Sequence, residues 1–377
     1  MNIHLRVILR RAARLSGLAL VALLLGGCFL LGPPDSGDNG TGDDADPDAT
    51  PTVYVGGYAY DGSVTDDEIA RFWQDGTSSD VKSASYDAVA TGVGASGSKV
   101  VVAGYYRDDS DTYYTAFQQV NGTLTNLSSG TDDADATHVF VDGSDVYVAG
   151  RFGAAPQNPA GYWKNGTWVG LPSDDDGTPV RARDITVVNG SVYVAGTDYT
   201  GGNGYRIPVV WVDGTKQTQT LPTGTPQNVD DAIAWGVATD GTTVFASGEA
   251  QQAIGSDKYA VVWEDGAPTV LDESGEAIAY AVEVHNGKVY AVGYIDQGSG
   301  SDSRAALWTI DDGAVASELL EESAYSEAYD IHIAANGNRY VAGYLYNGTE
   351  YVAAYWLNGT RVELDTAYSW ANAIVVR

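Results

Sequence analysis

Short runs of apolar residues recur along this chain, and each run ends on a glycine. Val146–Gly150 reads VYVAG, and Val192–Gly196 repeats it letter for letter. Seven such runs occur at intervals of 45 to 52 residues, ending at Gly57, Gly104, Gly150, Gly196, Gly248, Gly293 and Gly343. A repeated period in this range is the signature of a repeat architecture. Because the runs are apolar at every position, they predict strands that are covered on both faces.

Each repeat carries three further short segments that are rich in Val, Tyr, Trp and Thr and predict strands. The first begins with alanine, as in Ala136–Val141, and the third ends in an aromatic residue that we expect to fill the core: Trp73, Phe117, Trp163, Trp211, Trp263, Trp308 and Trp356. Asn-Gly or Asp-Gly separates the third segment from the fourth, and usually the first from the second. These dipeptides tolerate the positive φ of tight hairpins. Each repeat therefore predicts a four-stranded antiparallel meander.

The first segment is missing before Val53 and reappears at the other end of the chain as Ala371–Val376. We therefore expect the C-terminal strand to become the innermost strand of the first repeat. The predicted fold is all-β: a seven-bladed β-propeller of four-stranded antiparallel blades over residues 52–377, closed by the C-terminal strand joining the first blade. A solenoid with capped ends is the alternative, and the split repeat disfavours it.

The YVAG-type strands and the W-x-[ND]-G turns resemble kelch-like and related bacterial propeller repeats over Thr52–Arg377. Two features depart from the best-known families. Kelch repeats usually carry a double glycine after the second strand, and only Gly56-Gly57 has it here; no Trp-Asp dipeptide of the WD40 class occurs. The resemblance supports the fold and carries no function with it.

The N-terminal residues predict a targeting segment. Four arginines precede the apolar stretch Leu18–Leu25, which is too short to span a membrane. Leu25-Gly26-Gly27-Cys28 resembles the lipobox of bacterial lipoproteins. The resemblance implies that residues 1–27 are a signal peptide, that Cys28 is lipidated (palmitate included), and that Cys28 attaches the protein to the membrane of the cell envelope. Phe29 points to the outer membrane under enteric-type sorting. The alternative is an ordinary signal peptide with an incidental cysteine.

Composition narrows the function further. The chain has 50 Asp and Glu against 20 Lys and Arg, a formal net charge of −30, which disfavours nucleic acid as a partner. Cys28 is the single cysteine, so the folded part has no disulfide or thiol nucleophile. Residues 28–51 are rich in Gly, Pro and Asp and predict a disordered tether. The acids are scattered, which favours a solvating role; Ca²⁺ binding is possible but no motif supports it, and no other cofactor is expected.

In a meander of this kind the tight turns share one face and the longer connections share the other. Binding sites are usually built on such long loops. The candidate ligand residues on that face are Tyr60, Tyr106, Asp108, Tyr199, Tyr325, Tyr346, Tyr368 and Trp370. Tyr, Trp and carboxylates suit a carbohydrate or a protein partner. For the tyrosines that directly follow the repeat glycine, such as Tyr58, a purely structural repeat position is the alternative.

The third position of each innermost strand should face the central channel. Most of these residues are small, but His138, Asp184 and Asp330 are not. They are weak candidates for an acid–base or cation site, and the alternative is a hydrogen-bonded channel lining. No HExxH, GxSxG or P-loop motif occurs.

Three functions remain open. The leading hypothesis is a non-enzymatic, monomeric module that binds a protein or a glycan through the long-loop face. The second is a hydrolase or lyase that acts on an exported polysaccharide at the channel mouth, with Asp184 and Asp330 as its carboxylate pair. The third is a structural component of an envelope assembly. Convergence of His138, Asp184 and Asp330 on one open pocket would favour the enzyme, and dispersal around a solvated channel would favour binding.

Overall fold

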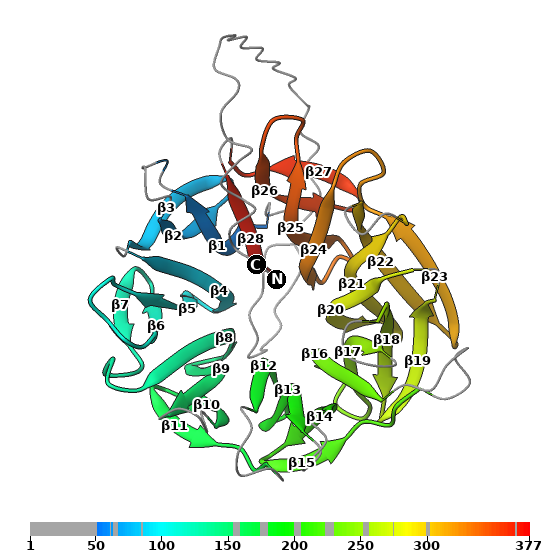
Figure 1. The fold of residues 1–377 in the computed structure, drawn as a ribbon, viewed down its shortest axis with the longest axis horizontal. Helices are drawn as coiled ribbons and strands as arrows, with labels where there is room; N and C mark the ends of the chain where they lie inside the picture. Colours follow the sequence, from blue (N-terminus) through cyan, green and yellow to red (C-terminus); the bar gives the residue numbers. More distant parts are fainter. Residues whose placement is uncertain are drawn as a thin grey trace, which may run out of the picture. The chain divides into compact units, whose positions relative to one another are not determined.

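The computed structural model describes residues 51–377, apart from 61, 63–66, 84–85, 154–158, 174–179, 200–204, 223–229, 252–255, 274, 299–301 and 366–367. The predicted signal peptide, Cys28 and the tether up to residue 50 lie outside the described residues. Across these described ranges, no helix is long and apolar enough to cross a membrane. The strands form seven separate four-stranded sheets arranged in a ring (Figure 1).

The blades follow one another in chain order, and in each the strands run from the innermost to the outermost. The first blade comprises β28 (Ser369–Val376), β1 (Val53–Tyr60), β2 (Glu68–Gln74) and β3 (Thr77–Ser83). The second comprises β4 (Asp87–Ser96), β5 (Lys99–Arg107), β6 (Thr115–Val120) and β7 (Thr123–Asn126). The third comprises β8 (Asp133–Asp142), β9 (Asp145–Gly153), β10 (Ala160–Lys164) and β11 (Thr167–Gly170). The fourth comprises β12 (Arg181–Val188), β13 (Ser191–Tyr199), β14 (Arg206–Val212) and β15 (Thr215–Thr218).

The remaining three blades have the same order. The fifth comprises β16 (Asp231–Thr239), β17 (Val244–Gln251), β18 (Lys258–Glu264) and β19 (Ala267–Asp272). The sixth comprises β20 (Ala277–His285), β21 (Lys288–Asp296), β22 (Ser303–Asp311) and β23 (Ala314–Leu319). The seventh comprises β24 (Ser326–Ile333), β25 (Arg339–Tyr346), β26 (Tyr351–Leu357) and β27 (Thr360–Glu363).

The predicted closure of the ring is confirmed. Strand β28 pairs antiparallel with β1, with Val375 opposite Tyr54 and Ile374 opposite Val55. Thr52 and Arg377 extend this ladder through two backbone hydrogen bonds. Figure 1 shows the red C-terminal strand beside the blue first strand at the axis. The first and last described strands therefore share one sheet, and the inner edge of β1 is paired.

The glycine that ends each repeat motif is required by close approach of the innermost strand. A Cβ added to Gly196 would lie 2.0 Å from the carbonyl oxygen of Arg181, and one added to Gly293 would lie 1.8 Å from that of Ile278. Beside each glycine the register of the inner hairpin shifts by one residue, as between Ala182 and Asp184. This shift is a β-bulge, and it recurs in all seven blades.

The third-strand aromatic residues form the core between blades, as predicted. Trp73, Phe117, Trp163, Trp211, Trp263, Trp308 and Trp356 are each at most 1% exposed. Trp211, for example, packs among Ala149 and Leu171 of the third blade and Val194 of its own. Each aromatic ring thus joins neighbouring sheets that share no backbone ladder.

The turns between third and fourth strands share one backbone geometry. In all seven, both turn residues have positive φ, as at Asn165 (51°) and Gly166 (80°), which is the type I′ hairpin geometry. The Asn165 side-chain oxygen also accepts the backbone N–H of Val146 at 2.9 Å, which explains why Asn or Asp precedes the glycine. Between the first and second strands only Asn189-Gly190 and Asn286-Gly287 share this geometry.

Candidate ligand-binding site at the channel mouth

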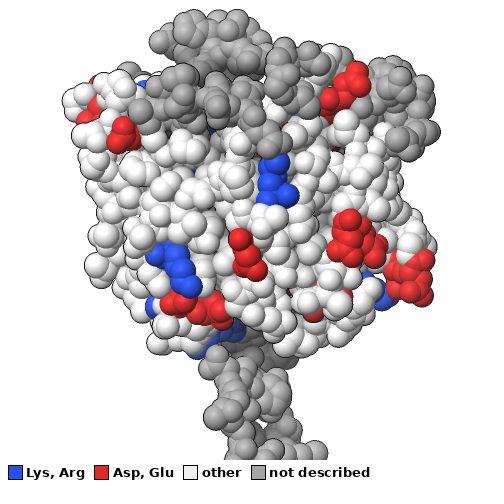
Figure 2. Space-filling view, turned by 90° about the horizontal axis from the view of Figure 1, so that it is seen from below, with Lys and Arg blue, Asp and Glu red and all other residues white. Residues whose placement is uncertain are grey.

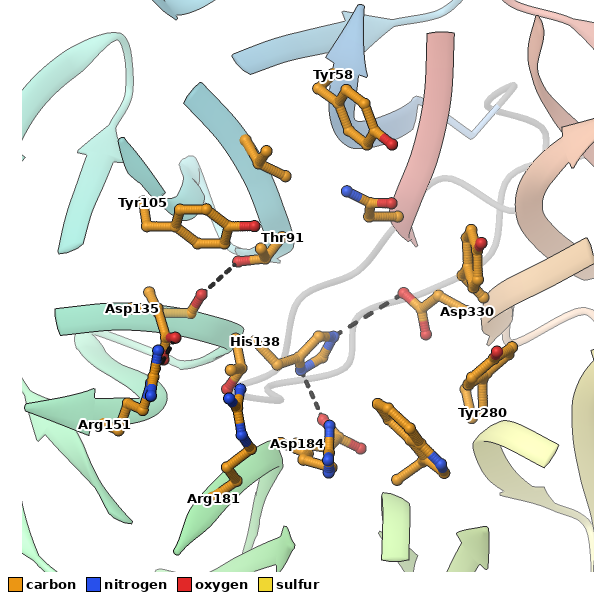
Figure 3. Close-up of a pocket in the computed structure, with 18 of the residues that line it drawn as sticks. Tyr58, Thr91, Tyr105, Asp135, His138, Arg151, Arg181, Asp184, Tyr280 and Asp330 are labelled. Atoms are coloured by element: carbon orange, nitrogen blue, oxygen red, sulfur yellow. Dashed lines mark hydrogen bonds and ion pairs between the residues drawn. The ribbon is translucent and has the colours of Figure 1, made fainter. Parts of the chain in front are cut away.

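A cavity of about 680 Å³ lies at one end of the central channel (Figure 3). Its wall includes residues near the start of inner strands, such as Asp135 and Arg181, and near the end of second strands, such as Tyr58, Tyr105 and Arg151. The long connections between second and third strands leave from this same end. The cavity therefore opens on the face where the sequence predicts binding.

All seven bulge residues line this cavity. They are Thr91, Thr137, Arg183, Trp235, Tyr280, Tyr329 and Asn372. Because a bulge leaves one residue unpaired, it re-aims a side chain that regular alternation would turn away from the channel. Counted from the alanine that begins each innermost-strand segment, the repeat indicated only the third residue as facing the channel. The bulge residues occupy the second position, so they were missed.

A signal for the bulge was present in the sequence. The tight turn pairs Val187 with Val192, and an unbroken ladder would then place Ala182 opposite Thr197. The repeat instead places the alanine opposite the glycine, Gly196. Small residues that are one place out of register with the turn therefore mark the bulge.

Six of the seven bulge residues contact the next blade around the ring. On one side the contacts are hydrogen bonds to carbonyl oxygens: Asn372 donates to Ala90 at 2.9 Å, and Thr91 donates to Ala136 at 2.9 Å. Thr137 likewise donates to Ala182 at 3.1 Å. On this side the residues are small, so they leave open space.

The other side of the ring is built from large side chains. The Arg183 guanidinium lies 3.7 Å from the centre of the Trp235 ring. Trp235 and Tyr280 have ring centroids 5.3 Å apart, and Tyr280 and Tyr329 are 5.2 Å apart. The cavity is thus asymmetric, with an arc of one cation and three aromatic rings facing small polar residues.

His138, Asp184 and Asp330 converge in the same cavity, although they come from three different blades. The Nδ1 atom of His138 lies 2.7 Å from an Asp184 oxygen, and its Nε2 atom lies 3.9 Å from an Asp330 oxygen (Figure 3). Burial lowers the pKa of His138, but Asp184 and then Asp330 outweigh it, so the pKa stands well above its usual value. The imidazolium therefore links two carboxylates across the axis.

Both carboxylates also bind backbone. Asp184 accepts the N–H of Ile185 at 2.7 Å and that of Val237 in the next blade at 2.8 Å. Asp330 accepts the N–H of Ile331 at 2.8 Å and that of Ile374 in the next blade at 2.8 Å. These oxygens hold neighbouring inner strands together. The arrangement thus meets the convergence expected of an enzyme, but its hydrogen bonds are those of the lining alternative.

The third blade contributes a separate ion-paired group to the wall. The Nε atom of Arg151 donates to Asp135 at 2.6 Å, and its Nη2 atom lies 3.4 Å from Asp133. Burial raises the pKa of Asp135, although Arg151 opposes this shift. Because Arg151 has two carboxylates of its own, its charge is already balanced.

Five of the eight predicted ligand residues lie together. Tyr60, Tyr325, Tyr346, Tyr368 and Trp370 belong to a continuous group of rings where the seventh and first blades meet, together with Tyr58, Tyr344 and Tyr351. We name these eight residues the aromatic seam. Trp370 is its centre, stacked on Tyr58 with centroids 5.0 Å apart. Tyr346 is 38% exposed at its edge.

The aromatic seam is continuous with the cavity. Tyr58 belongs to both, and Tyr329 of the bulge ring lies 5.7 Å from Tyr344 of the seam, measured between centroids. The strands run further than the sequence indicated, so Tyr60 and Tyr346 end strands rather than sitting in loops. Rigid strand ends therefore present most of these rings.

The other three predicted residues do not join the seam. Tyr106 lies in β5, where its ring contacts Lys82 and its hydroxyl accepts a hydrogen bond from Asn126. Asp108 lies in the connection after β5, and Tyr199 ends β13. Spacing within the repeat could not separate these residues from the five that meet.

Charge on the outside is distributed. In the view of Figure 2, Asp and Glu side chains occupy several separate places and a few Lys and Arg lie between them. In the part of the chain that the structure describes, no group of three or more His, Cys, Asp or Glu side chains could hold a metal ion.

Comparison with known proteins identifies no family. No family model and no curated protein matches the chain. A solved acylaminoacyl peptidase in complex with Z-Gly-Gly-Phe-chloromethyl ketone is similar at 12% identity and a TM-score of 0.48, covering 84% of this chain and 52% of its own. The β-propeller domain of the Trilobed protease from Pyrococcus furiosus, described as having an open velcro topology, is similar at 11% and 0.48, covering 84% and 97%.

The chain spans about half the length of that peptidase. Similarity at this level carries no function from either structure to this chain. The seven-bladed ring and its closure rest on the strand pairing of this protein itself.

Proposed function

We propose that this protein is an exported, lipid-anchored and non-enzymatic module that binds a glycan at the channel-mouth cavity and the aromatic seam. The observation that carries the proposal is the continuity of the seam with the cavity on the long-connection face. The seam meets the cavity at Tyr58 and at Tyr329, and Tyr329 continues along the cavity wall into the rings of Tyr280 and Trp235.

The chemistry of the walls suits a sugar. Tyr and Trp present a flat apolar face together with a polar edge, which matches the apolar faces and hydroxyl rims of sugar rings. A volume of about 680 Å³ falls within the usual range for small-ligand sites. The hydroxyls of Thr91 and Thr137 and the amide of Asn372 add polar groups on the opposite wall.

The hydrogen bonds of the carboxylates support binding rather than hydrolysis. Glycoside hydrolysis uses two carboxyl groups, one on each side of the scissile bond. Asp184 and Asp330 each accept two backbone N–H groups and face His138. Removing either from that network to act on a substrate would leave backbone donors in the channel without a partner.

Export and lipid anchoring are supported by the residues that resemble a lipobox, Leu25 to Cys28. Labelling of expressing cells with a radioactive fatty acid, followed by membrane fractionation, tests this part. The protein should carry label in the envelope fraction, and Cys28→Ala should abolish labelling. Labelling that survives in Cys28→Ala would refute the anchor.

A glycan array with the purified protein tests the binding function. We expect selective saccharide binding that Tyr346→Ala and Tyr368→Ala each weaken. Tyr162→Ala is the matched control, because Tyr162 is a half-buried tyrosine of the third blade outside the seam. A folded protein that binds no saccharide, or binding that the seam variants leave unchanged, would contradict the proposal.

A further inference from the structure

The cavity wall includes two arginines, Arg181 and Arg183, that have no ion-pair partner among the described residues. The half-buried Arg183 has one weak hydrogen bond, from Nε to the hydroxyl of Thr197 at 3.4 Å, and its stack on Trp235. Guanidinium carries five N–H donors. Most of the donors of Arg183 are therefore unused by the described residues.

The neighbouring basic residues are different. Arg206, in the same blade, binds Asp231 through two nitrogens and lies 3.7 Å from Glu249. Lys216 lies 2.7 Å from the carboxylate of Asp198. In a chain with 50 acidic and 20 basic residues, a carboxylate partner is easy to supply. Arg183 therefore differs from these two basic residues of its own blade, each of which has a carboxylate partner.

The charge of Arg181 also disfavours the protonated form of Arg183. Burial lowers the pKa of Arg183 to about 10, and the nearby charge of Arg181 is the next largest cause. The carboxylate of Glu249 opposes this shift without reversing it. Arg183 stays protonated at neutral pH, since 10 is well above 7. A desolvated cation next to a like charge is costly unless an anion accompanies it.

The surroundings limit what that anion can be. Arg181 is exposed at the cavity wall while Arg183 lies deeper, so both can reach one group that enters from the long-connection face. A planar guanidinium binds carboxylate and sulfate oxygens in a bidentate manner. Trp235 and Tyr280 lie beside Arg183 and supply ring surface for the body of the ligand.

We infer that Arg181 and Arg183 form an anion subsite, and that the cavity takes an acidic saccharide whose carboxylate or sulfate group pairs with these two arginines. The inference rests on the proposed glycan-binding function and names the class of glycan. It also explains why a chain of strongly negative net charge places these two arginines without an ion pair among the described residues at one cavity.

Calorimetric titration of the purified full-length protein tests the inference. The probes are galacturonate and glucuronate disaccharides, a sulfated galactose disaccharide and the matched neutral galactose disaccharide. We expect an acidic probe to bind at least tenfold more tightly than the neutral one. Tighter binding of the uronate disaccharides would identify a carboxylate as the bound group, and tighter binding of the sulfated disaccharide would identify a sulfate.

Variants locate the site. Arg183→Gln should weaken acidic-probe binding by roughly ten- to a hundredfold, the range for a lost charged hydrogen bond. The affinity of Arg183→Lys for the acidic probe should lie between those of the natural protein and Arg183→Gln, because lysine keeps the charge but loses the planar stack on Trp235. Arg339→Gln is the matched control, because Arg339 lies outside the cavity and is paired with Glu318. It should leave the affinity for the acidic probe unchanged.

Folding does not confound the test. Arg183→Gln removes a cation that has no carboxylate ion pair among the described residues, and with it the stack on Trp235, so its melting temperature should stay close to that of the natural protein. Equal binding of neutral and acidic probes, or full acidic-probe affinity in Arg183→Gln, would overturn the subsite while leaving glycan binding intact. Failure of every saccharide, neutral and acidic, would overturn both proposals.

Discussion

The carboxylate of Asp330 in β24 accepts the backbone N–H of Ile374 in β28 at 2.8 Å, between the seventh and first blades, where the ring closes. Asp184 in β12 makes the same bond to Val237 in β16, between two blades that are continuous in the chain. The same aspartate-to-backbone hydrogen bond thus links inner strands of neighbouring blades, both along the chain and where the ring closes.

This pair gives a matched test of the closure. Asp330→Ala and Asp184→Ala should each cost about 1–3 kcal/mol, because each leaves backbone donors unpaired. Hydrogen exchange should speed up at the amide of Ile374 in the first variant and at that of Val237 in the second. Unchanged exchange at both amides would show that neither carboxylate holds its neighbouring strand.

The repeat glycine should tolerate no side chain. Gly196→Ala would place Cβ 2.0 Å from the Arg181 carbonyl oxygen, so we expect a loss of about 1–3 kcal/mol or more in unfolding free energy. Gly170→Ala is the control, since its nearest contact would be an ordinary 3.7 Å. Chemical denaturation of both variants checks this, and equal stability would refute the close-approach explanation.

The core tryptophans should differ in how they tolerate phenylalanine. The Nε1 atom of Trp211 donates to the carbonyl of Pro172 at 2.8 Å, whereas that of Trp308 has no partner among the described residues. Trp211→Phe should therefore cost about 1 kcal/mol more than Trp308→Phe. Thermal or denaturant unfolding measures the difference, and the reverse order would contradict it.

Stability should depend on pH through Glu283 in β20. Its carboxylate accepts the N–H of Ile333 at 2.7 Å, yet burial raises its pKa to about 8, a shift that this hydrogen bond opposes and Asp330 reinforces. His332 is its other neighbour, 4.0 Å away, and burial lowers the pKa of that imidazole.

Between the ordinary Glu value of 4.5 and about 8, folded Glu283 holds a proton that the unfolded chain has lost. The free energy of unfolding should therefore fall as pH rises through this window, by at most about 1.4 kcal/mol per pH unit from this group. Glu283→Gln keeps an acceptor for Ile333 and should flatten the fall between pH 5 and 8. Denaturation at both pH values checks this, and a variant with an undiminished fall would exclude Glu283 as the cause.

Much of the fold was readable in the chain because its signals are local. Asn165-Gly166 dictates its own turn geometry, and the apolar run Val146–Ala149 demands cover on both faces wherever it lies. The absence of a first strand before Val53 and its presence at Ala371–Val376 required closure. These features depend on neighbours within a few residues, or on counting repeats.

The site was less predictable because it depends on register and on distance around the ring. His138, Asp184 and Asp330 were nominated from their shared repeat position, but their meeting across the axis and their bonds to backbone are tertiary. Arg183, Trp235 and Tyr280 were missed, since regular alternation assigns the second position to the other face.

The sequence alone thus determined seven meanders, their buried aromatic rings and the strand that joins the two ends, because turn chemistry and hydrophobic period act locally. Only the tertiary structure decided which side chains face the channel mouth. A one-residue bulge beside each repeat glycine re-aims a side chain, and closure of the ring brings together residues from blades that are far apart in the chain. For Arg183 the result is an arginine in the cavity wall without a carboxylate partner among the described residues, which no spacing in the sequence indicates.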